Sequence, residues 1–167
     1  MDGVVVRRIV PGEWSQLRRI RLEALADAPL AFGSTHEREA AYTDSHWQRH
    51  AAALAEGTWT VAMVGIHGTT LVALAQGYVD ENDPAIAHLI SVFVAPPWRG
   101  RGLGREVSAA VVDWARERGC RRALLNVADW NEPAREVYAS LGFAVTGRTK
   151  HLSHDRSITE HELALDL

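Results

Sequence analysis

The chain has 167 residues, of which 47% are hydrophobic and 23% charged, and its formal net charge is −3. These values fit one globular domain over residues 1–167, and the nearly balanced charge gives no reason to expect a nucleic acid or an anionic membrane as a partner. Cys120 is the single cysteine, which excludes an intramolecular disulfide and suits a reducing cytoplasm, where we expect the protein to be located.

The first third of the chain predicts one strand and two helices. Residues 4–9 are rich in valine and precede a proline and a glycine, which is typical of a strand that ends in a turn. Apolar residues then recur with a helical period over residues 14–25, and again over residues 43–57. Residues 30–42, between the two helices, have no clear period and are expected to be irregular.

Three strands are expected in the middle of the chain, at residues 58–66, 70–79 and 86–94. The third is apolar at both even and odd positions apart from His88 and Ser91, which is typical of a strand buried on both faces. Residues 57–79 carry no formal charge and are long enough to cross a membrane. However, polar and turn-forming residues interrupt this stretch at 65–70, so we expect a hairpin and no membrane association.

The remaining elements complete an alternating pattern. A helix is expected over residues 103–118, a strand over 122–128, a helix over 133–141, and strands over 143–148 and 157–165. The order is therefore β α α β β β α β α β β. It predicts an α/β (α+β-like) domain in which about four helices flank both faces of a mixed sheet of about seven strands.

The most informative segment is a glycine-rich turn between a buried strand and a helix. Glycines let a ligand approach the backbone, and the start of a helix presents unpaired N–H groups and a partial positive charge, so the turn predicts an anion site. The sequence lacks the lysine of a nucleotide P-loop, and its glycine spacing departs from the dinucleotide-binding pattern. A glycine-rich turn with exposed arginines and no ligand is the alternative. The turn contains Arg99, Gly100, Arg101, Gly102, Leu103, Gly104 and Arg105.

This turn resembles the R/Q-x-x-G-x-G/A motif of the GNAT superfamily of N-acetyltransferases. Arg99, Gly102 and Gly104 occupy the three motif positions, and a strand of the expected kind precedes them. The resemblance implies a mostly antiparallel sheet that splays between its fourth and fifth strands. It also implies acetyl-CoA as co-substrate, with the pyrophosphate on the N–H groups of the turn and the pantetheine arm along the strand backbone. The strand residues implied are Val92, Phe93 and Val94.

A second match follows downstream, in the family pattern N-x-x-A-x-x-x-Y-x-x-x-G-F. The pattern is met by Asn131, Ala134, Tyr138, Gly142 and Phe143. The resemblance implies that Asn131 and Ala134 bind the cofactor and that Tyr138 donates a proton to the departing thiolate, which a neutral phenol can do. Tyr138 as a core aromatic residue and Asn131 as a helix cap are the alternatives.

The general base differs from the family pattern. Many relatives carry a glutamate on the central strand, whereas residues 87–90 contain no carboxylate. His88 stands near that place and can take a proton from an amine, so we predict it as the catalytic base, with a hydrogen-bonded core histidine as the alternative and Glu81 as a weaker candidate. No metal is expected, because the other histidines, among them His151, His154 and His161, show no converging ligand set.

Together these features predict an N-acetyltransferase that moves the acetyl group of acetyl-CoA to a primary amine by direct transfer in a ternary complex. The acceptor is a small molecule or a protein amino group, with residues 32–39 either walling its site or forming a plain surface connection. A non-catalytic acyl-CoA sensor with the same fold is the alternative function. The sequence leaves the acceptor, the length of the acyl group and a homodimeric state open.

Overall fold

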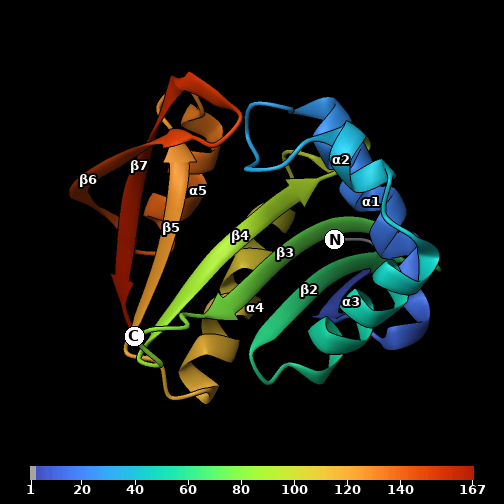
Figure 1. Cartoon of the computed structure of the whole chain (residues 1–167). Coiled ribbons are helices and arrows are strands. Elements are labelled where there is room, and N and C mark those ends of the chain that lie inside the picture. Colours follow the sequence, from blue (N-terminus) through green and yellow to red (C-terminus); the bar gives the residue numbers. More distant parts are fainter. Residues whose placement is uncertain (1–2) are drawn as a thin grey trace.

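The computed structural model describes residues 3–167, which form one seven-stranded sheet with helices on both faces (Figure 1). The strands are β1 (Val4–Arg8), β2 (Thr60–His67), β3 (Thr70–Val79), β4 (Ile86–Val94), β5 (Arg122–Ala128), β6 (Ala144–Leu152) and β7 (Asp155–Asp166). The helices are α1 (Trp14–Asp27), α2 (His36–Ala40), α3 (Asp44–Glu56), α4 (Leu103–Glu117) and α5 (Glu132–Ser140), with short 3-10 turns η1 (Pro11–Glu13) and η2 (Pro96–Trp98).

The strand order is β1-β2-β3-β4-β5-β7-β6. The pair β4 and β5 is parallel, whereas the other neighbouring strands are antiparallel. The predicted mixed, mostly antiparallel sheet is therefore confirmed. The parallel pair follows from the connection, because α4 carries the chain back across one face before β5 begins.

The sheet opens between β4 and β5. These strands pair only from Ile86 to His88 on β4, which lie opposite Arg122 to Leu124 on β5. Beyond this point the two strands diverge, as Figure 1 shows, while β5 continues to pair with β7 along its whole length. The predicted splay is thus confirmed. It leaves backbone polar groups of the second half of β4 without a β5 partner.

Two hydrophobic cores hold the layers together. One packs α1 and α3 against the face of β2 and β3 that is in front in Figure 1, and the other packs α4 and α5 against the opposite face. Trp47 on α3 and Trp114 on α4 are almost completely buried at the centres of these cores. Within residues 3–167, no helix packs in front of β5, β7 and β6, so the front face of these three strands is open (Figure 1).

A bulge interrupts β4 next to the opening. Leu74 on β3 pairs with Phe93, and Gln76 pairs with Ile90, so Ser91 and Val92 together oppose one residue of β3. Ser91 has a φ of 57°, the one positive value of a non-glycine residue among residues 3–167. Such a bulge kinks the strand and redirects its side chains, and bulges are common beside active sites.

The structure adds one helix to the sequence-based prediction. The segment over residues 30–42, expected to be irregular, contains α2, whose five residues are too few to produce a helical period. The hydroxyl of Thr35 accepts a hydrogen bond from the N–H of Arg38 at 3.2 Å and caps this helix. Glu39, near the other end of α2, is buried, and its carboxylate accepts two hydrogen bonds from Arg21.

The last two strands are also longer than expected. Strands β6 and β7 extend toward each other until only a tight turn separates Leu152 from Asp155. Strand β6 lies at the edge of the sheet and is mostly exposed, so it lacks the alternation of apolar residues on which strand prediction depends. Within residues 3–167 no helix combines the length and apolar character needed to cross a membrane.

Candidate active site

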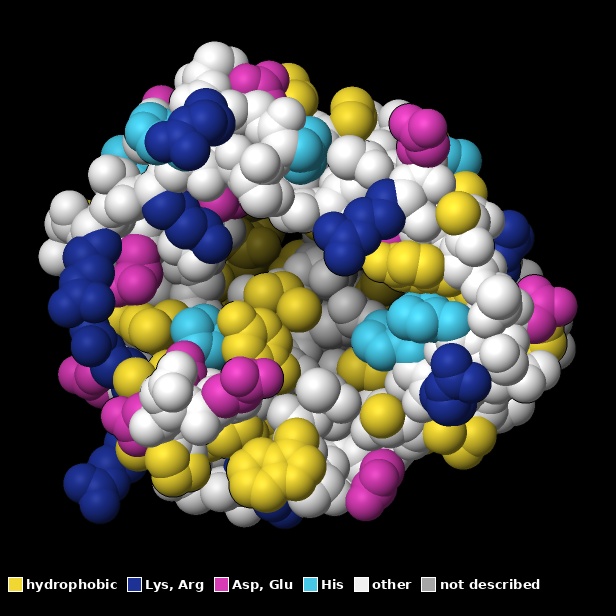
Figure 2. Space-filling model, viewed as in Figure 1, with side chains coloured by type: hydrophobic (Ala, Val, Ile, Leu, Met, Phe, Trp, Pro, Cys, Tyr) yellow, Lys and Arg dark blue, Asp and Glu magenta, His cyan; other side chains and the backbone are white. Residues whose placement is uncertain are grey.

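A cleft of about 860 Å³ occupies the opening between β4 and β5 and continues to the open front face. Figure 2 shows this face hollowed near its middle, with hydrophobic side chains along the hollow and histidine side chains on both sides of it. The second half of β4, the start of α4 and the inner face of α5 line the cleft. The cofactor residues predicted from sequence that line it are Val92, Phe93, Val94, Arg99, Gly100, Gly102, Leu103, Gly104, Arg105, Asn131 and Ala134, together with Tyr138.

The glycine-rich turn forms the upper end of the cleft. Gly100 and Gly102 have φ values of 75° and 82°, a region that strains other residues, and Gly102 leads directly into α4 without a side-chain cap. The first N–H groups of α4 have no intrahelical partner. Gly104 has no side chain to cover these N–H groups. The start of α4 therefore offers amides and a partial positive charge to an anion.

The three arginines of the turn differ in their surroundings. The Arg99 guanidinium donates to the carboxylate of Asp27 on α1 at 2.5 Å and to the carbonyl of Val94 at 2.9 Å. The Arg101 guanidinium lies 5.2 Å from the centre of the Trp98 ring, and Arg101 does not line the cleft. Arg105 does line it. Arg105 therefore lines the cleft without an ion pair to another side chain within residues 3–167, and cofactor binding by each of the three arginines stays a prediction.

Tyr138 projects from α5 into the wall of the cleft. Its side chain is 8% exposed and packs edge-on against Phe143, with 6.2 Å between the ring centres. Burial raises the pKa of the Tyr138 phenol, because the phenolate would lose its hydration. The phenol is thus neutral over the whole physiological range and can donate a proton. Tyr138 is thus a core residue that also lines the cleft, and its role as the proton donor stays a prediction.

Asn131 caps the helix that carries Tyr138. Its side-chain oxygen accepts a hydrogen bond from the N–H of Ala134 at 3.3 Å, which is the cap geometry considered from sequence. Asn131 and Ala134 also line the cleft. The side-chain NH₂ of Asn131 is left to donate elsewhere, so the cap is compatible with the predicted contact to the cofactor.

His88 lies on β4 in the short stretch where β4 and β5 still pair. Its Nε2 is 2.7 Å from a carboxylate oxygen of Asp80, and its ring stacks on Tyr78 with 4.6 Å between centres. Tyr78 lines the cleft, whereas His88 is not among its lining residues. The hydrogen bond from His88 lowers the pKa of Asp80, with further help from the N–H groups of Asn82 and Asp83. Asp80 thereby stays ionised and orients the imidazole.

Several residues of the cleft were not predicted. Arg21 on α1 donates two hydrogen bonds to Glu39, both at 2.9 Å, and a third to the hydroxyl of Ser91 at 3.2 Å. Arg21 stands four residues from both Leu17 and Leu25 on the apolar side of α1, a position where a charged residue indicates a buried partner. Glu39 lies in a segment without any period, so no comparable signal exists for it.

A buried glutamate on β7 also lines the cleft. Glu160 is 8% exposed, and the ammonium of Lys150 on β6 lies 3.8 Å from its carboxylate. Lys150 pairs with Glu160 across the two strands. The sequence showed Glu160 only as one of several alternating charged residues on a strand, and the pairing of β7 with β5 is what brings it to the opening.

The stretch over residues 30–42 borders the cleft, in agreement with one of the two sequence-based interpretations. Phe32, Gly33 and Ser34 are among the lining residues. The β6–β7 turn lies beside this stretch, because the Ser153 hydroxyl donates to the carbonyl of Gly33 at 2.7 Å. Figure 1 shows the two connections meeting above the opening. They close the top of the front face between the two halves of the sheet.

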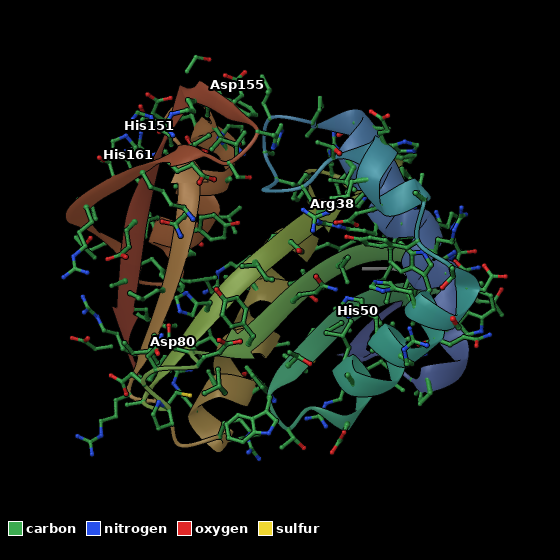
Figure 3. The ribbon with its side chains drawn as sticks, in the orientation of Figure 1. Arg38, His50, Asp80, His151, Asp155 and His161 are labelled. Atoms are coloured by element: carbon green, nitrogen blue, oxygen red, sulfur yellow. The ribbon has the colours of Figure 1, made fainter. Side chains whose placement is uncertain are left out.

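The histidines do not converge on one point. Figure 3 shows His151 and His161 on the β6–β7 hairpin, away from His50 on α3. Among residues 3–167, no group of three or more His, Cys, Asp or Glu side chains is arranged to hold a metal ion.

Comparison with known proteins identifies relatives for this arrangement. Residues 17–143 match the family model described as "Acetyltransferase (GNAT) family". An aminoglycoside N(6′)-acetyltransferase type 1 from Stenotrophomonas maltophilia is 31% identical over 148 residues, which cover 86% of this chain and 88% of that protein. A mycothiol acetyltransferase from Thermobispora bispora is 33% identical over 144 residues, which cover 85% of this chain and 47% of that protein.

The chain spans about a third to a half of the length of the first curated relatives that it matches. Among solved structures, yncA from Salmonella typhimurium with its cofactor acetyl-CoA has a TM-score of 0.81 and 17% identity, over 99% of this chain and 95% of that one. At this identity the likeness is one of fold.

Proposed function

The chain belongs to the GNAT acetyltransferase family, and from this premise we propose that it transfers the acetyl group of acetyl-CoA to a primary amine. The observation that carries the proposal is a single continuous cleft. In it, the open amides of the α4 start stand at one end and the buried phenol of Tyr138 stands in the wall. One cleft, open to the front face, can therefore hold an anionic cofactor and bring it to a proton donor.

Each part of the cleft has a role in this proposal. The N–H groups at the start of α4, with Arg105, bind the pyrophosphate. The pantetheine arm lies along β4 beyond the bulge, where its amides pair with strand groups that β5 leaves free. The thioester then lies beside β4 within the opening between β4 and β5, and the acceptor amine enters from the open face.

The transfer itself needs one bond made and one broken. The neutral amine nitrogen attacks the thioester carbonyl carbon, and the carbon–sulfur bond breaks as the carbonyl reforms. The N–H of Val94 is a candidate donor to the oxyanion, as the resemblance to the family implies. Tyr138 donates its proton to the leaving thiolate, and the nitrogen loses a proton to a base or to water. The products are an N-acetylated amine and coenzyme A.

Turnover in the presence of amines is the direct test. The protein is mixed with acetyl-CoA, and release of the free thiol of coenzyme A is followed with and without primary amines, including amino sugars, amino acids and peptides with free N-termini. We expect thiol release to depend on the amine and an acetylated product to be found by mass spectrometry. Tight binding of coenzyme A with no release for any amine supports the acyl-CoA sensor instead.

We keep His88, oriented by Asp80, as the proposed proton acceptor. His88→Gln is expected to lower kcat about tenfold, less than the roughly 10²–10⁴ usual for such a group, because water in the open cleft can take the proton instead. Unchanged kcat together with a lower Tm would assign His88 a purely structural role.

A further inference from the structure

A second, smaller cavity of about 250 Å³ opens beside the main cleft, between α1, α3 and the front face of β3 and β4. The two spaces share Arg21, Ile90 and Ser91 in their walls, so they are contiguous at the β4 bulge. Figure 3 shows His50, one of its lining residues, on α3 in front of the sheet. Ligand pockets commonly measure about 300–1,000 Å³, so this cavity can take part of a substrate and not a whole one.

The floor of the small cavity carries an amide side chain. Gln76 on β3 is 6% exposed and lines the cavity, and the side-chain hydrogen bonds within residues 3–167 include none from its amide. Its amide is not among the fully enclosed side-chain groups without a partner in this part of the chain, so it is open to the cavity. An amide can make four hydrogen bonds, and the Gln76 amide is therefore placed to bind a polar group that enters the cavity.

A second unpartnered donor lies in the same wall. The indole N–H of Trp47 on α3 is buried and has no hydrogen-bond partner among the described residues. Trp47 is 2% exposed and lines the cavity with Gln76. Trp47 offers a donor and an aromatic face, and Gln76 offers both a donor and an acceptor.

The cavity carries little net charge. Arg21 and Glu39 form a bidentate pair whose side chains are 12% and 10% exposed, so their charges balance. Burial raises the pKa of Glu39, but the hydrogen bonds and charge of Arg21 outweigh burial and lower it, which keeps the carboxylate ionised. Burial and the neighbouring His46 lower the pKa of His50, so its imidazole is neutral near pH 7.

We propose that the small cavity is an acceptor subsite that binds an uncharged hydroxyl group of the amine substrate through Gln76 and Trp47. The inference rests on the proposed function and names a class of acceptor for it, namely a ring amine that carries hydroxyl groups away from its amino group. A hydroxyl both donates and accepts, as this pair requires. A carboxylate or a second ammonium group is disfavoured, because the local charges are already paired.

Gln76→Leu and Trp47→Phe test the subsite with matched acceptors of one ring size. Cyclohexylamine has no hydroxyl, trans-4-aminocyclohexanol has one, and glucosamine has several. Gln76→Leu is expected to lower kcat/KM for the hydroxylated amines about tenfold and to leave the value for cyclohexylamine unchanged. Trp47→Phe should act in the same direction and keep the aromatic packing. A thermal melt of each variant without acceptor checks that the fold is retained.

For each amine, kcat/KM of the variant is divided by kcat/KM of the wild type, which removes the effect of differences in amine basicity. Equal losses for all three acceptors, or none, overturn the subsite while leaving the acetyltransferase assignment intact. A preference of the wild type for trans-4-aminocyclohexanecarboxylate over the hydroxylated amines also overturns it. Binding of glucosamine to the protein saturated with coenzyme A is measured by calorimetry in parallel. Gln76-dependent binding without any turnover would contradict the proposed function and support the subsite, and absence of such binding would overturn the subsite.

Discussion

Replacement of Tyr138 by phenylalanine is expected to lower kcat about 100-fold while coenzyme A binds as tightly as before. The substitution removes only the hydroxyl, and the ring keeps its edge-on contact with Phe143. Without the phenol, the thiolate of coenzyme A must leave unprotonated or take its proton from water. In the proposed function the cofactor binds to the α4 start and to β4, which the substitution does not change.

The pH dependence of this role follows from burial. The pKa of the Tyr138 phenol is raised above the ordinary value of 10.0, because burial disfavours the phenolate. A general acid must be protonated, and a raised pKa extends the protonated form toward alkaline pH. Loss of the Tyr138 proton should therefore not lower the kcat of the wild type at any pH up to about 10. Any decline in kcat over this range should also be seen in the Tyr138→Phe variant.

Tyr78→Phe provides a matched comparison, since Tyr78 also lines the cleft and loses the same hydroxyl. It should lower kcat far less than Tyr138→Phe does. Calorimetry with coenzyme A and a thermal melt of each variant separate chemistry from folding. If Tyr138→Phe keeps the kcat of the wild type, the phenol is a core residue alone, and the leaving group takes its proton elsewhere.

The parts of the site predicted from sequence are those built within a short stretch of chain. The start of α4 is one turn of backbone, so Gly102 and Gly104 define it by their spacing. Tyr138 and its cap Asn131 lie on one short helix, and helical geometry fixes their relation. The splay of β4 and β5 was implied by the resemblance to the family, so it could be predicted without knowing which side chains contact one another.

The parts missed from sequence depend on contacts between distant segments. Arg21 and Glu39 meet because α1 and the short α2 pack together, and Glu160 reaches the cleft because β7 inserts beside β5. The bulge at Ser91 arises from the register of β3 against β4, which no local pattern records. In the proposed function these residues lie on the acceptor side. The sequence therefore predicted residues that line one end of the cleft and left the other end largely unassigned, and the roles of both ends in binding stay predictions.

Gly104→Val is expected to weaken coenzyme A binding by at least about 100-fold, or about 2.8 kcal/mol, without loss of thermal stability. Gly104 is the second residue of α4 and lines the cleft, and its φ lies outside the positive region. A Cβ at this position would have Val94 Cγ2 as its one neighbour within 4 Å, at an ordinary 3.6 Å. The fold thus has room for a side chain, and the space that a side chain would fill is the space we assign to the pyrophosphate.

Gly104→Ala is expected to raise the stability of the fold and to weaken the binding of coenzyme A. Alanine favours a helix over glycine by about 1 kcal/mol, so the variant should melt at a slightly higher temperature. It should nevertheless bind coenzyme A less tightly than the wild type, because one methyl group enters the anion site. Gly12→Ala is the control, since Gly12 also has a φ outside the positive region and no atom within 4 Å of the place that a Cβ would take, but lies outside the cleft.

Calorimetric titration with coenzyme A of the two Gly104 variants and the control decides the outcome. If Gly104→Val remains folded and binds coenzyme A as the wild type does, the start of α4 is not the pyrophosphate site. Glycine at this position would then serve no ligand, although it weakens the first turn of α4. Loss of binding in a variant that is at least as stable as the wild type places the anion on these amides, since no damage to the fold accompanies the loss.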